Sequence, residues 1–301
     1  MNLCLGTVQL GMDYGIRGQK KPSLDESIAM LDYAAQNGVT HLDTAYAYGE
    51  AEAVVGAFIK KRTIPRDRLF ISAKLRPNIM DGVARDSIYK VARSNLEESF
   101  GRMGVDYLDA YMCHSSHYVY DDFILEAMAR LKDEGLVRHV GVSVYEVKEA
   151  KKCLSDVRLD YMQLPFSVLD QRMADGGVFE SCDTCRITID SRSAFIQGLV
   201  LMEVEEIPPF LSRSYPIIQK LDALCNCHGL SRTELALGFV KQVREISNLV
   251  FGVDNLAQLK EDIDIFNRIE LSSEVITDIG KVFRDLPADI VMPSLWKRVD
   301  S

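Results

Sequence analysis

The sequence lacks the long apolar run that a membrane-spanning helix requires. Nowhere in its 301 residues does an apolar stretch approach the length of about 20 residues that crosses a bilayer. The opening residues also lack the basic and then apolar pattern of an export signal, because Gly6, Gln9, Gly11 and Asp13 interrupt them. We therefore expect a cytoplasmic protein that does not associate with a membrane.

Positive charge is scarce as well. The chain has 35 Lys and Arg residues against 44 Asp and Glu residues, which gives a formal net charge of -9 at pH 7. An acidic surface repels nucleic-acid phosphates and anionic lipid headgroups. The composition therefore argues against nucleic acid and membrane partners. We expect a small-molecule ligand instead, and a monomer or a small homo-oligomer.

Cysteine motifs with the spacing of a metal site are missing. The seven cysteines are an odd number and are scattered, which favours reduced thiols. Cys182 and Cys185 form a C-x-x-C, and Cys225 and Cys227 a C-x-C, but neither pair has a second pair at ligand spacing. We therefore favour thiols without a function at Cys182 and Cys185, and a metal or redox role is the alternative. With no H-E-x-x-H and no carboxylate cluster, we expect no metal site.

What the sequence does contain is a regular alternation of strand and helix patterns. Short apolar, β-rich runs predict strands at Leu3–Leu5, Val39–Leu42, Leu69–Ala73, Tyr107–Met112, Val137–Val142, Leu159–Leu164, Ile187–Asp190 and Leu249–Phe251. Amphipathic patterns predict helices between and after these strands. They lie near 24–35, 54–59, 88–103, 124–131, 146–154, 216–228, 232–242, 255–266 and 275–283. Eight such units favour a single (β/α)8 TIM barrel over residues 1–301. A long connection near 194–214 follows the seventh strand, and 285–301 form an irregular tail.

The alternative to a barrel is an open, doubly wound sheet. Such a fold places a glycine-rich phosphate loop after its first strand. The residues from Gly6 to Gly11 do not fit G-x-G-x-x-G, which favours the barrel.

Polar side chains stand where successive predicted strands end. In a barrel these positions gather at the carboxyl-terminal face, where barrel enzymes build their sites. One such residue alone is better explained as a surface ion pair, but a series on consecutive strands is not. The series consists of Asp43 with Tyr48, Lys74, His114, Ser143, Gln163 and Arg192.

The first four of these residues suit proton-coupled reduction. A tyrosine with a pKa of about 10 is a weak acid near neutrality. An ammonium such as Lys74 favours the phenolate of Tyr48, and a carboxylate such as Asp43 holds that ammonium in place. His114 can orient a substrate carbonyl by donating a hydrogen bond.

These residues also carry a family resemblance. Asp43-Thr44-Ala45 with Tyr48-Gly49 and Glu52, followed by Lys74 and His114, resembles the D-T-A-x-x-Y-G-x-x-E…K…H pattern of the aldo-keto reductases. Gly141-Val142-Ser143, Gln163-Leu164-Pro165-Phe166 and Gln197-Gly198-Leu199 resemble further family blocks in the same order. The resemblance implies reduction of an aldehyde or ketone to an alcohol with NADPH or NADH. Tyr48 would be the general acid, tuned by Lys74 and Asp43, and His114 would orient the carbonyl.

The same resemblance implies a cofactor site. Ser143 and Gln163 would hold the nicotinamide carboxamide, the loop after the seventh strand would cover the pyrophosphate, and the segment after the eighth would hold the adenosine. The residues concerned are Gly6, Thr7, Asp43, Ser143, Gln163, Arg192, Ser193, Phe195, Gln197, Gly198, Leu199, Gly252, Gln258, Glu261 and Asp262.

The chain departs from the family pattern in several places. Val144 replaces an asparagine that usually contacts the carboxamide, and Arg192 replaces the aromatic residue that stacks on the nicotinamide. A guanidinium there disfavours the cationic oxidised ring or meets an anionic substrate. Gln258 stands where the family often has a basic residue for the adenosine 2′-phosphate, and Asp262 stands where an asparagine is usual. The choice between NADPH and NADH therefore stays open. We also expect no amino-terminal hairpin below the barrel.

Substrate contacts are expected from three loop residues, Tyr14, Tyr46 and His117, which would ring the mouth of the site and suit a small or sugar-derived carbonyl compound. Two other functions are weighed. A nucleotide-binding regulatory or scaffold barrel without turnover is disfavoured by the complete set of Asp43, Tyr48, Lys74 and His114. A sugar or alcohol dehydrogenase, or an epimerase using the same site, is disfavoured by Arg192.

Overall fold

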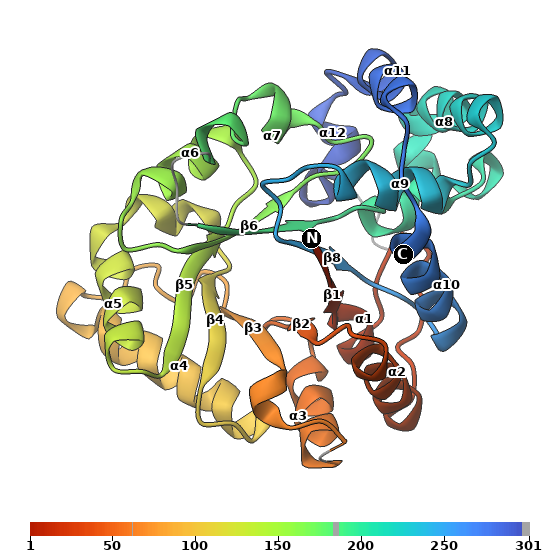
Figure 1. Ribbon diagram of the computed structural model, residues 1–301. Helices are drawn as coiled ribbons and strands as arrows, with labels where there is room; N and C mark the ends of the chain where they lie inside the picture. Colours follow the sequence, from red (N-terminus) through yellow and green to blue (C-terminus); the bar gives the residue numbers. More distant parts are fainter. Residues whose placement is uncertain (62, 183–186, 297–301) are drawn as a thin grey trace.

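In the computed structural model, which describes residues 1–61, 63–182 and 187–296, parallel strands close into a barrel. Each strand pairs with its neighbours in chain order, and the last pairs with the first (Figure 1). The strands are β1 (Asn2–Gly6), β2 (His41–Asp43), β3 (Phe70–Leu75), β4 (Leu108–Cys113), β5 (Val137–Ser143), β6 (Tyr161–Pro165), β7 (Thr188–Arg192) and β8 (Asn248–Phe251). The predicted TIM barrel is confirmed.

Helices form a ring around the barrel (Figure 1). Those that follow the first five strands are α1 (Val8–Gly11), α2 (Leu24–Gln36), α3 (Ala51–Lys61), α4 (Ile88–Met103), α5 (Asp122–Asp133) and α6 (Val147–Ser155). Those that follow the later strands are α7 (Arg172–Asp175), α8 (Tyr215–His228), α9 (Arg232–Lys241), α10 (Leu256–Arg268), α11 (Ser273–Phe283) and α12 (Ala288–Val291). Apolar residues of both layers make one large buried core between helices and strands.

Local sequence signals explain several boundaries. A capping box formed by Ser23 and Glu26 begins α2, where each side chain bonds the other residue's backbone amide. Gly104 ends α4 in the left-handed conformation, which glycine adopts without steric cost. The predicted strands differ from the observed ones at their ends. Lys74 and Arg192 lie inside β3 and β7 rather than beyond them.

The long connection after β7 contains short 3-10 turns, η5 (Ile196–Leu201), η6 (Val204–Glu206) and η7 (Pro209–Ser214), before α8 begins. The crossover from β6 to β7 has no long helix among its described residues, which include only α7 and the 3-10 turn η4 (Glu180–Cys182). The helices therefore stand less evenly around β6 and β7 than around β3 to β5 (Figure 1).

Aromatic rings cross the barrel interior at the amino-terminal ends of the strands. The ring centroid of Phe70 lies 4.8 Å from that of His41 and 5.8 Å from that of Tyr161. The Tyr161 hydroxyl donates to Oδ2 of Asp190 at 2.7 Å, and the Asn248 amide donates to Oδ1 of Asp190 at 2.7 Å. Burial raises the pKa of Asp190 to about 7, although the hydrogen bonds from Asn248 and Tyr161 act in the opposite direction.

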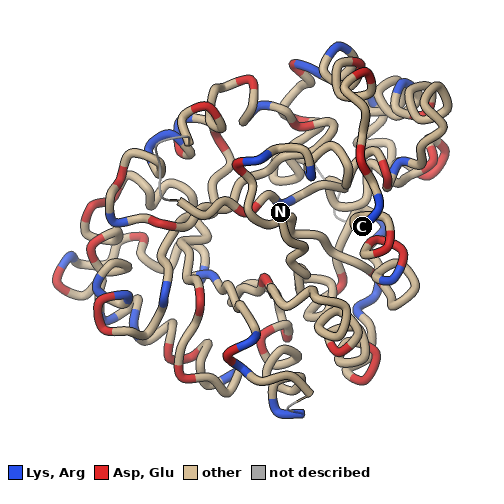
Figure 2. The backbone as a smooth tube through the Cα atoms, viewed as in Figure 1, with Lys and Arg blue, Asp and Glu red and all other residues tan. Residues whose placement is uncertain are grey.

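Charged residues of both signs are interspersed along the outer helices and loops (Figure 2). No helix in the described part of the chain is long and apolar enough to cross a membrane.

Candidate active site

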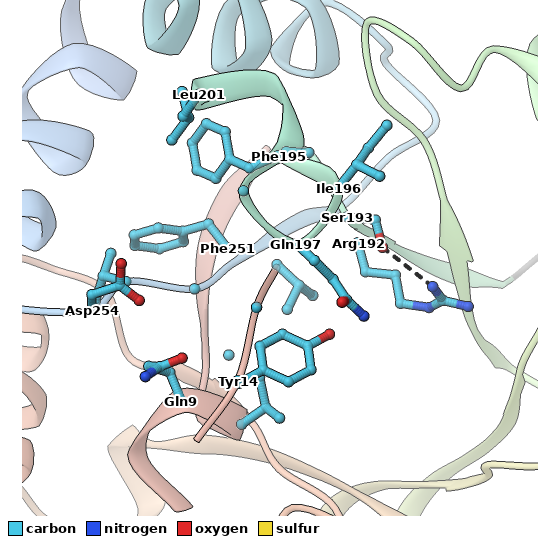
Figure 3. A pocket seen from close by; sticks show the side chains of 18 of the residues that line it. Gln9, Tyr14, Arg192, Ser193, Phe195, Ile196, Gln197, Leu201, Phe251 and Asp254 are labelled. Atoms are coloured by element: carbon cyan, nitrogen blue, oxygen red, sulfur yellow. Dashed lines mark hydrogen bonds between the residues drawn. The ribbon is translucent and has the colours of Figure 1, made fainter. Parts of the chain in front are cut away.

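A cavity of about 830 Å³ opens at the carboxyl-terminal ends of the strands. Its walls come from the loops after β1, β2, β7 and β8, together with the ends of β4 to β6. Figure 3 shows the walls beside β1, β7 and β8. Many of the predicted site residues line it: Gly6, Tyr14, Asp43, Tyr48, His114, Ser143, Gln163, Arg192, Ser193, Phe195, Gln197, Gly198, Gly252, Gln258, Glu261 and Asp262.

A buried hydrogen-bonded chain leads from β2 and β3 to the cavity. Nζ of Lys74 donates to Oδ1 of Asp43 at 2.5 Å and to the hydroxyl of Tyr48 at 3.2 Å. Lys74 is fully buried, Asp43 nearly so, and Tyr48 is partly exposed to the cavity. The chain therefore ends in a phenol that faces the cavity and is backed by an ammonium.

The backbone of the Tyr48 loop is fixed by a close approach to α1. A Cβ atom on Gly11 would lie 1.9 Å from the carbonyl oxygen of Tyr48, so no larger residue fits at position 11. The carbonyl of Gly11 also accepts the amide of Glu50 at 3.0 Å. This contact holds the loop, and with it the phenol, against the first turn of the chain.

Burial has the largest effect on the pKa values of Tyr48 and Lys74 in this hydrogen-bonded series. It raises the pKa of Tyr48 to about 12, although Lys74 acts in the opposite direction. Burial alone would lower the pKa of Lys74, but Asp43 and Tyr48 outweigh it and raise that pKa above its usual value. Lys74 was expected to favour the phenolate. It does, but desolvation is the larger effect, so Tyr48 carries its proton at neutral pH.

His114 follows β4 and faces Tyr48 edge-on, with ring centroids 5.9 Å apart. Burial, and then the charges of Lys74 and Arg192, lowers the pKa of His114 to about 3. Its Nδ1 atom is buried and has no hydrogen-bond partner among the described residues. At neutral pH this imidazole is therefore uncharged and carries one N–H.

Gln163 on β6 reaches across the barrel to Asp43. Its Nε2 atom donates to Oδ1 of Asp43 at 2.8 Å. An ionised carboxylate only accepts hydrogen bonds, so the amide must turn its nitrogen to Asp43 and its oxygen away. That oxygen, Oε1, is buried and unpartnered among the described residues, although Gln163 lines the cavity. The site therefore presents an unused acceptor.

The loop after β7 is strained where it lines the cavity. Ser193, Ile196 and Gln197 have φ values of 67°, 47° and 54°, in the left-handed region that non-glycine residues rarely adopt. The carbonyl of Gln197 accepts the amide of Ile16 at 3.1 Å, and Arg17 pairs with Glu206. The loops after β1 and β7 thus join across the cavity, near Tyr14 and Gln197 in Figure 3.

The end of the cavity next to β8 is acidic. Asp254, Glu261 and Asp262 all line it, and Gln258 accepts the amide of Asp254 at 2.7 Å. Burial, and then the charge of Glu261, raises the pKa of Asp262 to about 7. Arg232, which also lines the cavity, is already paired with Asp222 and Glu203.

Tyr145 is a cavity residue that the sequence analysis missed. It follows β5 by two positions, so an aromatic residue just past a strand end was the available signal. The guanidinium of Arg192 lies over its ring, 4.3 Å from the centroid. Gln9 and Met12 line the cavity too and were also missed, whereas Asp254 falls within the segment after β8 that was predicted to hold the adenosine.

Five predicted residues do not line the cavity, and the first of them, Lys74, reaches it only through Tyr48. Thr7 is fully buried and donates its hydroxyl to the backbone carbonyl of Asp43 at 2.9 Å, and Leu199 is buried in the core. Tyr46 turns outward, with its ring 4.2 Å from the guanidinium carbon of Arg102. His117 lies on the exposed 3-10 turn η3 (Ser116–Tyr120), against Asp81. The expected positions of Tyr46 and His117 at the cavity mouth are therefore corrected.

The C-x-x-C motif lies partly outside the described residues, since Cys185 falls in the gap at 183–186. Cys182 is half-buried, and its thiol donates to the carbonyl of Val178 at 3.0 Å. No group of three His, Cys, Asp or Glu residues placed to hold a metal occurs in the ranges that the structure covers.

Comparison with known proteins agrees with this geometry. The sequence model of the aldo/keto reductase family matches residues 2–284. L-galactose dehydrogenase of Arabidopsis thaliana is 24% identical, with 86% of this chain and 84% of that protein aligned. NADH-specific methylglyoxal reductase of Escherichia coli is also 24% identical, over 76% of this chain and 79% of the relative. In fold, the crystal structure of a thermostable aldo-keto reductase with the inhibitor epalrestat superposes with a TM-score of 0.70, covering 93% of this chain and 94% of the other at 24% identity.

Proposed function

The chain belongs to the aldo/keto reductase family, and from this premise we propose that it reduces a small or sugar-derived aldehyde or ketone to an alcohol, with Tyr48 as the proton donor. Membership of the family makes it an NAD(P)-dependent oxidoreductase. The observation that carries the role of Tyr48 is the chain from Asp43 through Lys74 to a phenol at the cavity wall.

The cavity suits a nicotinamide cofactor in its volume and in offering a hydrogen-bond acceptor that has no partner among the described residues. Its volume of about 830 Å³ is in the upper part of the range of small-molecule sites. A carboxamide bears an NH2 group, and the buried Oε1 of Gln163 is an acceptor without a partner among the described residues. Ser143 and Gln163 would hold the carboxamide. The loop Ser193–Gly198 would hold the pyrophosphate, and the segment from Gly252 to Asp262 the adenosine.

When bound, the reduced cofactor supplies a hydride to the carbonyl carbon. Tyr48 supplies the proton to the carbonyl oxygen, on which negative charge develops. The phenolate left behind lies 3.2 Å from the Lys74 ammonium, which stabilises it, while Asp43 holds that ammonium in place. His114 is uncharged at neutral pH, so its N–H orients the carbonyl without competing as an acid.

The protonation state of Tyr48 favours reduction over oxidation. With a pKa of about 12, the hydroxyl holds the proton that reduction consumes, whereas alcohol oxidation needs the phenolate as a base. One relative is a dehydrogenase by name, so the oxidative direction is the second candidate. The complete Asp43, Tyr48, Lys74 and His114 set argues against a scaffold without turnover.

The acidic end of the cavity supports use of NADH. The 2′-phosphate of NADPH needs a cation, and the wall beside β8 offers Asp254, Glu261 and Asp262 instead. One relative is an NADH-specific reductase by name. We propose that NADH serves at least as well as NADPH.

A panel of aldehydes and ketones, each supplied with NADH and then NADPH, tests this function. The loss of absorbance of the reduced nicotinamide measures turnover, and chromatography identifies the alcohol formed. We expect reduction of at least one carbonyl class. Tight nucleotide binding without turnover of any carbonyl or alcohol would favour the scaffold alternative.

A further inference from the structure

Arg192 differs from the other arginines at the cavity in having no acidic partner among the residues that the structure describes. The described residues that line the cavity include Arg17, Arg192 and Arg232. Arg17 pairs with Glu206, and Arg232 pairs with Asp222 and Glu203. Arg192 forms no ion pair with any carboxylate in the described ranges, although it is half-buried. Its positive charge is therefore available to a ligand.

Neutral groups fix the Arg192 side chain in place. Its guanidinium stacks on the Tyr145 ring at 4.3 Å, one terminal nitrogen donates to the carbonyl of Val144 at 3.1 Å, and the other to the hydroxyl of Ser193 at 3.3 Å (Figure 3). A guanidinium has five N–H groups, so several remain unused. Keeping a partly desolvated charge without a counter-charge is unfavourable, and an anion that binds beside it would relieve that cost.

The Arg192 guanidinium lies in the same cavity as the reacting groups. Arg192 ends β7 and shares the cavity wall with Tyr48, His114 and Tyr145. It is close enough to His114 for its charge to contribute to the low pKa of that imidazole. An anionic group bound by Arg192 would thus belong to a molecule whose carbonyl is near the phenol.

We propose that the physiological substrate is a carbonyl compound with an anionic group, a carboxylate or a phosphate monoester, and that Arg192 binds this group. The inference rests on the proposed reductase function and names its substrate class. Arg192 thereby selects for substrates whose anionic group can reach it.

Matched substrate pairs test this inference on the whole protein. One pair is 4-carboxybenzaldehyde and its neutral methyl ester, methyl 4-formylbenzoate. The other is glyceraldehyde 3-phosphate and glyceraldehyde. The quantity measured is the ratio of kcat/KM for the anionic member to that for the neutral member. We expect a ratio above about 10 in the wild-type protein for at least one pair, which identifies the carboxylate or the phosphate as the preferred anion.

Three variants isolate the charge. Arg192→Gln should lower the ratio by about 10- to 100-fold, as expected when a charge-assisted hydrogen bond is lost. Arg192→Lys keeps the charge without the planar fork and should retain part of the preference. Arg17→Gln removes a cavity arginine that is already neutralised by Glu206, so its ratio should match that of the wild-type protein. Far-UV circular dichroism of each variant checks that it is folded, and its Kd for NADH is measured separately.

The alternative ligand of Arg192 is the cofactor itself. In that case Arg192→Gln would weaken NADH binding and slow both members of a pair equally, leaving the ratio unchanged, which would overturn the inference. Equal reduction of charged and neutral members by the wild-type protein would overturn it too while leaving the reductase function intact. Failure to reduce any carbonyl compound would instead remove the reductase function and this inference with it.

Discussion

The amide nitrogen of Gln163 lies 2.8 Å from Oδ1 of Asp43, although the two residues come from β6 and β2 on different sides of the barrel. The same carboxylate oxygen accepts Nζ of Lys74 at 2.5 Å and the hydroxyl of Ser72 at 3.2 Å. One oxygen therefore connects the residue proposed to hold the carboxamide with the ammonium behind Tyr48. Changes at Gln163 should affect both cofactor binding and proton transfer.

Replacing Gln163 by methionine tests this connection. The substitution keeps the side-chain length but removes the donor to Asp43 and the unpartnered acceptor Oε1. We expect the Kd of NADH to rise by about tenfold, as for loss of one net hydrogen bond, together with a fall in kcat. Gln171→Met is the control, because Gln171 is also a buried amide but bonds the carbonyl of Val168 outside the cavity. An unchanged Kd in Gln163→Met would remove Gln163 from the cofactor site.

Cofactor choice should respond to charge at the β8 end of the cavity. We expect the wild-type protein to bind NADPH no more tightly than NADH. In Glu261→Lys the preference should move towards NADPH by about tenfold, because an acid on the wall becomes a cation. Asp264→Lys makes the same charge change on the same helix, α10, at a residue that is not part of the cavity wall, and should leave the ratio of the two Kd values unaltered. Titration with both nucleotides measures each Kd. A thousandfold wild-type preference for NADPH would contradict the reading of this wall.

Stability should depend on pH through Asp190. The folded-state pKa of about 7 exceeds the ordinary value of about 3.8, so the folded chain holds a proton that the unfolded chain releases between these values. The contribution of Asp190 to the free energy of unfolding is therefore fully present below about pH 4 and is lost as the pH rises through 7. This loss amounts to up to about 4 kcal/mol.

Asp190→Asn removes the titration while leaving groups that can bond Tyr161 and Asn248. The expected result is that the variant gains stability relative to the wild-type protein as pH rises from 5 to 8, measured by urea unfolding at each pH. A stability difference that stays constant over this range would show that Asp190 does not hold a proton in the folded protein.

The fold was predictable because its signals are local and repeated. Alternating apolar strands and amphipathic helices indicate a barrel, and strand ends such as Asp43 and Gln163 then converge by topology alone. Side-chain direction in the loops was not predictable. Tyr46 and Tyr48 are two residues apart, yet one packs outward on Arg102 and the other lines the cavity.

The net effect of burial and nearby charge on a pKa could not be predicted from the sequence either. The resemblance brings Lys74 and Tyr48 together, but only the structure gives the burial that lets desolvation outweigh the ammonium in setting the Tyr48 pKa. In the same way, the positive charge of Arg192 is evident from the sequence, whereas its stacking on Tyr145 and its lack of a carboxylate partner among the described residues depend on tertiary structure.

The role of the Tyr48 hydroxyl as proton donor is tested by turnover and NADH binding of Tyr48→Phe. We expect kcat to fall by at least about 100-fold, the usual scale of general acid catalysis, with NADH still bound. Tyr46→Phe is the matched control, since Tyr46 loses the same hydroxyl outside the cavity and should keep full activity. Full activity in Tyr48→Phe, with NADH bound as in the wild-type protein, would contradict the account.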